Sequence, residues 1–340
     1  MGQVFNLRPI FNRPAEAGYK PRPRGHPGCN PAPLAMTHRS GFVSIIGRPN
    51  AGKSTLLNAL TGNKLAIVSD KPQTTRTAIQ GVVTEPGAQI VFIDTPGIHK
   101  SDTLINRRMM DTVRAAVEER DLLLFVADAS VPMSAADRDA VDLARKIPAP
   151  VFLLLNKIDR VPDKRALLPF IENYKQLHDF AEYFPISAEK GDGLGDLRKA
   201  IVARLPEGPK YFPDDYLTDQ PERFMAAEIV REKILAATRQ EVPHAIAVMV
   251  ETWEDNPKLL RIAATVYVER AGQKAIVIGA RGATLKSIGS AARLELEATF
   301  SKKVFLELFV KVRPGWREDP AFLNAIDWRS MTGDSPAIME

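Results

Sequence analysis

A glycine-rich turn directly after an apolar run restricts the fold of this chain more than any other feature of its sequence. Residues 47–54 read Gly-Arg-Pro-Asn-Ala-Gly-Lys-Ser and match G-x-x-x-x-G-K-[ST]. The apolar residues 42–46 precede the turn, and Leu56, Leu57 and Leu60 follow it at helical spacing. This order predicts a strand, a phosphate-binding loop and a helix, because glycine lets the backbone N–H groups turn toward phosphate.

The side chains of this loop suit a triphosphate with a metal ion. Lys53 is expected to reach the β- and γ-phosphate oxygens, and the hydroxyl group of Ser54 is expected to bind Mg²⁺. The alternative is a glycine-rich strand-to-helix turn that binds nothing. The residues expected to contact nucleotide here are Gly47, Arg48, Pro49, Asn50, Ala51, Gly52, Lys53, Ser54 and Thr55.

Apolar runs alternate with amphipathic stretches from about residue 41 to residue 205. Runs that are apolar on both faces and bounded by turn residues predict buried strands of a parallel sheet. Their alternation with helical patterns predicts an α/β domain with a mostly parallel, doubly wound sheet. The expected strands are 42–46, 90–93, 122–127, 151–155 and 183–186.

Asn156-Lys157-Ile158-Asp159 follows one of these strands, at the sheet edge where α/β folds hold ligands. Asp159 can accept both N1–H and the exocyclic amine of guanine, whereas adenine offers no such donor pair. The stem of Lys157 would stack across the base, and Ser187-Ala188 would supply a backbone N–H to the guanine O6. The base is therefore predicted to be guanine, although N-K-x-D alone is a frequent surface turn.

Two further segments are expected to respond to the γ-phosphate. Asp94-Thr95-Pro96-Gly97 follows the strand at 90–93, so Asp94 is expected to hold Mg²⁺ through water and the N–H of Gly97 to contact the γ-phosphate. Either Thr74 or Thr75 should bind Mg²⁺ only when GTP is present, and we favour Thr75. The alternative for residues 69–77 is a polar loop.

Hydrolysis is predicted to be slow and assisted by a cation. Ile98 stands where Ras-like proteins carry the glutamine that orients the attacking water. Asn50 resembles the asparagine that lets related GTPases bind K⁺ beside the phosphates, which predicts K⁺ stimulation; its alternative role is to stabilise the loop. The residues expected to act in hydrolysis are Lys53, Asn50, Thr75 and Gly97.

The second half of the chain predicts a compact α+β unit. Residues 206–221 are rich in proline, glycine, aspartate and aromatic residues, which indicates a linker. A helix at about 223–238, strands at 245–252 and 260–269, an apolar strand at 275–278, a helix at 284–300 and a strand at 303–313 follow. Leu285, Ile288, Ala292 and Leu296 are expected to form a core stripe.

Gly279-Ala280-Arg281-Gly282 lies between the short apolar run and the long helix. Two glycines would let a nucleic-acid backbone approach closely, and the helix N-terminus would meet phosphate. Lys286 and Arg293 would extend the basic edge, although such charges usually form only a solvated face. The residues expected to bind RNA are Gly279, Ala280, Arg281, Gly282, Lys286 and Arg293.

Composition bounds the remaining possibilities. The contents of 45% hydrophobic and 26% charged residues are typical of a soluble globular protein. The sequence has no apolar run of the roughly twenty residues that a membrane span needs. Cys29 is the single cysteine, which excludes an intramolecular disulfide. The net charge of +5 is compatible with RNA but does not require it. A proline-rich, basic leader precedes Met36 and is expected to be disordered. Two alternatives are that Met36 is the true start of the protein and that the leader is an organellar presequence.

The chain as a whole resembles the Era family of GTPases, which carry a KH domain of the second type. The resemblance covers about residues 41–316 and includes G-R-P-N-x-G-K-S, P-Q-T-T-R at 72–76, D-T-P-G-I, N-K-I-D and the linker 211–222. Ala280 departs from the basic or polar residue common at its position. The resemblance divides the chain into a leader (1–37), a GTPase domain (38–206), a linker (207–222), a type II KH domain (223–315) and a tail (316–340).

The resemblance implies a function in maturation of the 30S ribosomal subunit, with binding near the 3′ end of 16S-type rRNA. It also implies a cytoplasmic monomer with possible peripheral attachment to the inner membrane. The competing predictions are an ATP-dependent or tRNA-modifying P-loop enzyme, against which Asn156 and Asp159 argue, and an RNA chaperone in which nucleotide only holds structure.

Overall fold

The computed structural model describes residues 38–71, 73–98, 103–118, 120–238, 242 and 245–329. The expectations for the leader and for the last eleven residues lie outside these ranges. The described residues belong to one compact unit, which contains a six-stranded sheet followed by a three-stranded sheet.

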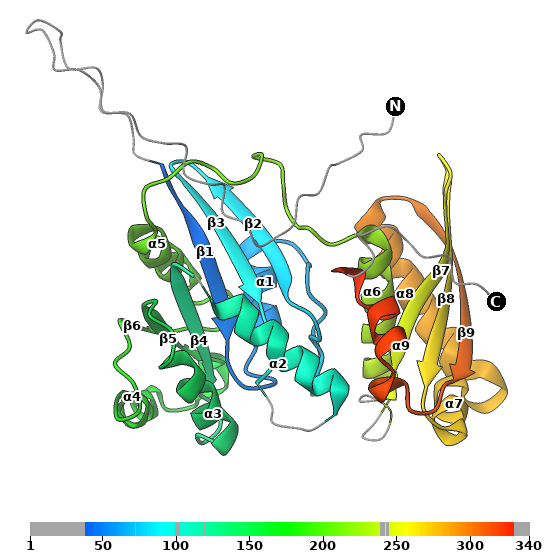
Figure 1. Ribbon diagram of the computed structural model, residues 1–340, viewed down its shortest axis with the longest axis horizontal. Coiled ribbons are helices and arrows are strands. Elements are labelled where there is room, and N and C mark those ends of the chain that lie inside the picture. The colour runs from blue at the N-terminus through cyan, green and yellow to red at the C-terminus, as the bar shows by residue number, and fades with distance from the viewer. Residues whose placement is uncertain are drawn as a thin grey trace, which may run out of the picture. The chain divides into compact units, whose positions relative to one another are not determined.

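The first sheet has the strand order β2-β3-β1-β4-β5-β6, and every neighbouring pair except β2–β3 is parallel (Figure 1). β3 and β4 are buried along their whole length, as their apolar composition predicts. The strands are β1 (Arg39–Ile46), β2 (Ile79–Glu85), β3 (Ala88–Asp94), β4 (Leu122–Asp128), β5 (Val151–Asn156) and β6 (Glu182–Pro185).

Helices cover both faces of this sheet. Buried leucine and isoleucine side chains of α1 and α5 pack on one face, and side chains of α2, α3 and α4 pack on the other. The sheet is therefore doubly wound, as predicted. The helices are α1 (Lys53–Thr61), α2 (Leu104–Val117), α3 (Ala135–Ala144), α4 (Leu167–Lys175) and α5 (Leu194–Arg204).

The second sheet has the order β7-β8-β9, with an antiparallel pair β7–β8 and a parallel pair β8–β9. Its apolar core includes Ile234 of α6 and the predicted stripe on α8, of which Ile288, Ala292 and Leu296 are buried and Leu285 is partly buried. The elements are α6 (Glu222–Ala237), β7 (Ala247–Asp255), β8 (Leu259–Val268), α7 (Ala271–Ile278), α8 (Ala283–Phe300), β9 (Lys303–Val312) and α9 (Pro320–Ile326).

One prediction of secondary structure is wrong, one strand was not predicted, and one predicted strand differs in its burial. Residues 275–278 end the helix α7 instead of forming a strand. This helix begins where the Gln273 side chain accepts hydrogen bonds from the backbone N–H groups of Glu269 and Arg270. A four-residue apolar run alone does not distinguish a helix from a strand. The antiparallel strand β2 was missed. The last strand of the sheet, β6, is an edge strand and partly exposed, not buried on both faces.

Residues 207–221 of the linker contain no helix or long strand, whereas Glu222 already begins α6. The linker is nevertheless bonded to the first sheet. The Val82 N–H donates to the Leu217 carbonyl oxygen at 2.8 Å, and the Thr218 hydroxyl group donates to the Gln80 carbonyl oxygen at 2.7 Å. The Gln89 side chain accepts hydrogen bonds from the backbone of Tyr211 and Phe212. The segment is therefore attached along β2 and β3, which its turn-rich composition did not indicate.

Candidate guanine-nucleotide and RNA sites

The phosphate-binding loop connects β1 to α1 at the carboxyl edge of the sheet. Gly47, Asn50 and Gly52 adopt positive φ angles of 148°, 61° and 100°. A Cβ atom at Gly47 would lie 2.4 Å from the Val126 carbonyl oxygen, so glycine is required there for a steric reason as well. The loop therefore has the backbone that its glycines predicted.

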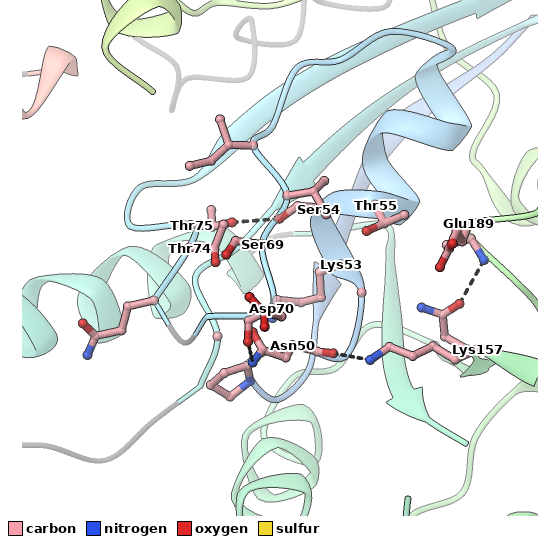
Figure 2. A pocket seen from close by; sticks show the side chains of 18 of the residues that line it. Asn50, Lys53, Ser54, Thr55, Ser69, Asp70, Thr74, Thr75, Lys157 and Glu189 are labelled. Atoms are coloured by element: carbon pink, nitrogen blue, oxygen red, sulfur yellow. Dashed lines mark hydrogen bonds between the residues drawn. The ribbon is translucent and has the colours of Figure 1, made fainter. Parts of the chain in front are cut away.

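A cavity of about 450 Å³ lies over this loop. It is lined by the P-loop, by residues 67–70 and 73–75, by Gly97, and by residues of the base-recognition segment and the loop after β6. Figure 2 shows Lys53, Ser54, Thr75 and Lys157 around it. The predicted residues, which lie more than 130 positions apart in the chain, thus meet at one site of a size suited to a small-molecule ligand.

The Lys53 ammonium group lies at the floor of the cavity. Its Nζ donates to the carbonyl oxygens of Gly47 and Arg48 at 3.1 and 3.0 Å. Burial lowers the pKa of Lys53 to about 8, since the nearby Asp94 opposes this shift only in part and Arg48 adds to it. Phosphate oxygens would replace the missing negative charge and favour the protonated form.

The base-recognition segment is anchored to the P-loop by its asparagine. Asn156 Nδ2 donates to the Ala51 carbonyl oxygen at 2.8 Å, and Asn156 Oδ1 accepts from the Ala188 N–H at 3.0 Å. Asp159 Oδ1 accepts from the Ser187 hydroxyl group at 2.7 Å, which lowers the pKa of Asp159. Asp159 is thus held as an ionised acceptor, the form that guanine requires, while the contact from Ala188 to O6 stays a prediction.

The three predicted magnesium ligands converge on one side of the cavity. Ser54 Oγ lies 2.6 Å from Asp94 Oδ2. It also lies 2.8 Å from Thr75 Oγ1 (Figure 2). Burial raises the pKa of Asp94 to about 6 against the effect of Lys53 and of the two hydroxyl groups, and Asp94 Oδ1 has no hydrogen-bond partner among the described residues. A buried carboxylate beside two hydroxyl oxygens fits Mg²⁺, which prefers oxygen ligands.

The choice between the two threonines follows from where their hydroxyl groups point. The Thr74 hydroxyl group donates to the Lys71 carbonyl oxygen at 2.6 Å and so closes a local turn. Thr75 is 7% exposed and its hydroxyl group faces Ser54 and Asp94. The geometry favours Thr75 as the ligand.

Gly97 and Ile98, which follow β3, lie against Pro49 and Gly47 of the P-loop. A Cβ atom at Gly97 would lie 2.7 Å from Pro49 Cα, so only glycine allows this approach. The Ile98 N–H donates to the Gly47 carbonyl oxygen at 3.3 Å, and the Ile98 side chain is 3% exposed and packs in the core under α2 and α3. Ile98 therefore offers no group that could orient water.

The predicted RNA-binding loop forms a sharp turn between α7 and α8. Gly279, Arg281 and Gly282 have φ angles of 72°, 52° and 80°, and a Cβ atom at Gly279 would lie 2.1 Å from Thr284 Oγ1. The side chains of Ala280 and Arg281 are exposed, and nothing lies within 4 Å of a Cβ atom at Gly282. The loop thus leaves open the space that a phosphate backbone needs beside the N-terminus of α8.

The three predicted basic residues of this edge lie in different surroundings. Arg281 and Lys286 are exposed, but Arg293 lies two turns further along α8, where its Nη1 donates to Glu297 Oε1 at 3.0 Å. The charge of Arg293 is therefore paired within the helix.

Comparison with known protein families gives two matches, each over one of the sheets. A family described as 50S ribosome-binding GTPase matches residues 42–157, and the KH domain family matches residues 241–317. A protein named GTPase Era from Geobacter metallireducens is 52% identical, over 85% of this chain and 98% of its own length. This chain belongs to the Era family of GTPases.

Solved structures of the family agree with this assignment. The crystal structure of a single-residue variant of Aquifex aeolicus Era bound to GDP·AlF4⁻ is 41% identical, with a TM-score of 0.82 over 85% of this chain and 99% of its own. An Era complex with MgGDPNP and nucleotides 1506–1542 of 16S ribosomal RNA is also 41% identical, with a TM-score of 0.83 over 86% and 99%. The predicted fold class, a P-loop GTPase domain followed by a KH domain, is confirmed, and the protein is a GTPase.

Sequence reasoning missed the groups that hold this GTPase site together. Arg48 Nη2 lies 3.2 Å from Asp128 Oδ2, and Arg48 Nε lies 3.3 Å from Asp137 Oδ1; both carboxylates are buried. The only signal in the sequence was the position of Asp128 directly after the apolar run 122–127. Its pairing with Asn156 between β4 and β5 is seen only in the structure. Asp137 also caps α3 together with Ser134, and this local role conceals its contact with the P-loop.

Proposed function

We propose that this GTPase binds 16S-type rRNA near its 3′ end and acts in maturation of the 30S ribosomal subunit. The observation that carries the proposal is the open Gly279-Ala280-Arg281-Gly282 turn at the start of α8, in a KH domain that follows a complete guanine-nucleotide site. The Era relative whose structure holds nucleotides 1506–1542 of 16S rRNA supports the choice of RNA.

Two aspartates in this loop test the proposal. The change Ala280→Asp with Arg281→Asp places negative charge where phosphate would lie, so affinity for an RNA fragment of the 16S 3′ end should fall at least about a hundredfold while GTPase activity persists. The matched control is Ala298→Asp with Lys303→Asp, which makes the same change in charge at the far end of α8, where both residues are exposed. Unchanged RNA affinity in the loop variant would show that the loop does not bind this RNA.

Measuring the affinity of the wild type for the same RNA fragment in different nucleotide states separates the GTPase switch from an RNA chaperone. A switch binds RNA with different affinities in its GDPNP and GDP states, because the γ-phosphate reorders the segments around Thr75 and Gly97. Equal RNA affinity in both states and without nucleotide would favour the chaperone.

Ser54, Thr75 and Asp94 would hold Mg²⁺, because their oxygen atoms lie together at one side of the cavity. When bound, the ion neutralises the charge that develops on the phosphate oxygens. The side chains of this chain supply the geometry: Ser54 comes from the start of α1, Asp94 from the end of β3, and Thr75 from the segment between them.

Hydrolysis is slow by itself and is stimulated by K⁺. The buried Ile98 supports the first part, because it leaves the site without a water-orienting amide. Asn50 lines the phosphate site in a left-handed conformation, and this position supports the second part. The hydrogen bond that its Nδ2 donates to the Asp70 carbonyl oxygen at 2.6 Å (Figure 2) serves the alternative role of stabilising the loop. K⁺ at this position would supply positive charge to the phosphates. Equal GTPase rates in K⁺ and Na⁺ buffers would refute this part.

The protein acts as a cytoplasmic monomer, with peripheral attachment to the cytoplasmic face of the membrane as a further possibility of the family. The resemblance alone supports this part. Among the described residues, none of the helices is long and apolar enough to cross a bilayer. Fractionation of cells in low and high salt, followed by size-exclusion chromatography, tests location and oligomeric state together.

A further inference from the structure

A buried arginine of the KH half reaches the segment that carries the predicted magnesium ligand Thr75. Arg231 lies on α6 and is 2% exposed. Its Nη2 donates to the carbonyl oxygen of Thr74, the residue before Thr75. A guanidinium group is costly to bury, so its partners define what it does.

Arg231 is held in place by one carboxylate. Glu228, one turn earlier on α6, accepts hydrogen bonds from Arg231 Nε at 2.7 Å and from Arg231 Nη2 at 2.6 Å. This two-point pairing fixes the plane of the guanidinium group. Arg231 therefore presents a rigid donor to the Thr74 carbonyl oxygen.

The residue after Thr75 is held from the same half of the molecule. Arg76 Nη1 donates to the Ile246 carbonyl oxygen at 2.6 Å, and its guanidinium group lies 5.5 Å from the centre of the Trp316 ring. Trp316 is fully buried, and its Nε1 donates to the Ala245 carbonyl oxygen at 3.1 Å. Thr75 is thus flanked on both sides by residues that are fixed by the second half of the chain.

The start of the same segment is held as well. Glu232, next to Arg231 on α6, accepts from the Val68 N–H at 2.9 Å and from Lys64 Nζ at 2.7 Å. Lys64 also pairs with Glu295 of α8, the helix that begins at the RNA-binding loop. The segment that carries Thr75 is therefore bonded to α6, and Lys64, just before this segment, also pairs with α8, the helix that follows the RNA-binding loop.

We propose that Arg231 is a positioning residue for GTP hydrolysis, through which the KH half of the chain holds Thr75 at the magnesium site. Arg231 does not line the nucleotide cavity and acts through the Thr74 carbonyl oxygen. The proposal rests on the proposed binding of Mg²⁺ by Thr75. Arg231 should therefore affect the affinity for GTP and not that for GDP, because Thr75 is expected to bind Mg²⁺ only when GTP is present.

Nucleotide affinities of the full-length protein test this. Affinities for GDPNP and GDP are measured with and without Mg²⁺ in the wild type and in Arg231→Met, Thr75→Ala and Arg223→Met. Arg223 is exposed on the same helix and serves as the matched control. Arg231→Met should lower the affinity for Mg²⁺–GDPNP about tenfold, the effect of losing a hydrogen bond from a charged group, and should leave GDP affinity within about twofold.

A second readout follows the segment directly. In the GDPNP complex, amide hydrogen exchange at residues 73–78 should be faster in Arg231→Met than in the wild type and unchanged in Arg223→Met. Arg231→Lys keeps one donor but loses the two-point pairing with Glu228, so it should restore affinity in part. A residue that only stabilised the fold would lower GDP and GDPNP affinity together.

The outcomes separate the two proposals. If Thr75→Ala does not change Mg²⁺–GDPNP affinity, the proposed metal role of Thr75 is wrong. If Thr75→Ala lowers it but Arg231→Met behaves like Arg223→Met in both readouts, the role of Arg231 is wrong. Should Arg231→Met not fold, Glu228→Gln decides: it should lower the ratio of GDPNP to GDP affinity about threefold, and an unchanged ratio overturns the proposal.

Discussion

The Lys157 ammonium group donates a 2.7 Å hydrogen bond to Asp128 Oδ2, the same oxygen that lies 3.2 Å from Arg48 of the P-loop. Lys157 Nζ also donates to the Asn50 carbonyl oxygen at 2.7 Å. Asp128 thus joins the segment that recognises the base to the loop that binds the phosphates. Although burial raises the pKa of Asp128, the hydrogen bonds from Lys157 and Ser130 outweigh it, and the pKa is lowered.

Replacing Asp128 by asparagine should weaken GTP and GDP binding alike, each about tenfold. The neutral amide keeps the size of the side chain but leaves two partly buried cations, Arg48 and Lys157, without their shared counter-charge. Isothermal titration with both nucleotides measures the effect, and Asp142→Asn, at an exposed carboxylate of α3, is the control. A loss confined to GTP would contradict a role in holding the two loops together.

Asp159→Asn should change the preferred base. The asparagine amide can no longer accept from both guanine donors, so GTP affinity should fall at least about a hundredfold. Xanthosine triphosphate, which has a carbonyl group in place of the exocyclic amine, should bind the variant better than GTP does. Competition between the two nucleotides measures this, with the exposed Asp163→Asn as control; an unchanged preference would mean that Asp159 does not contact the base.

Gly97→Ala should impair hydrolysis while sparing GDP binding. The added methyl group would meet Pro49 at 2.7 Å, so the segment must move away from the P-loop and take its N–H from the γ-phosphate. Single-turnover GTPase rates should fall about tenfold or more, and GDP affinity should change less than about twofold. Gly195→Ala is the control, because no atom lies within 4 Å of a Cβ atom there.

Asp219 should make stability depend on pH. Burial raises its pKa to about 6, against the effect of Arg329, so the folded protein holds a proton that the unfolded chain releases near pH 4. This contribution to stability is complete below the unfolded pKa and is lost as the pH rises through 6. Between pH 5 and 7.5, the free energy of unfolding of the wild type should fall about 1.5 kcal/mol more than that of Asp219→Asn.

Urea unfolding at the two pH values measures this difference. The control is Asp215→Asn, at an exposed carboxylate in the same linker. Parallel pH dependence in the wild type and in Asp219→Asn would contradict the assignment.

The two glycines of the RNA-binding loop should differ in their tolerance of alanine. Gly279→Ala would place a methyl group 2.1 Å from Thr284 Oγ1 in a backbone region that only glycine adopts readily, and should destabilise the KH half by about 1–3 kcal/mol. Gly282→Ala meets no atom and should cost only about 1 kcal/mol for its left-handed φ. Thermal unfolding compares them, and equal losses would contradict the steric argument.

Much of the fold and of the nucleotide site could be predicted because the relevant signals are local. Strands buried on both faces are continuous apolar runs, and the P-loop, the Asp94 motif and the Asn156 motif each stand directly after such a run. The wrong assignment of residues 275–278 has the same origin: a short apolar run carries no periodicity, and the side chain that decides for a helix, Gln273, lies outside it.

The contacts that organise the site could not be predicted in this way. Asp128 meets Arg48 across 80 positions, and Arg231 meets Thr74 across 157. Neither pair shares a motif, and a charged residue on a helix such as α6 is most often exposed. Only the packing of α6 shows that Arg231 is buried.

The sequence by itself therefore determined that a guanine-nucleotide site precedes a KH domain, since the backbone of a P-loop and the donor pattern of a base are met by a few adjacent residues. The tertiary structure alone decided which threonine faces the metal site, which carboxylate joins the two nucleotide loops, and which arginine of the KH half reaches the GTPase segment. These depend on which distant side chains share a buried space, and burial is a property of the whole fold.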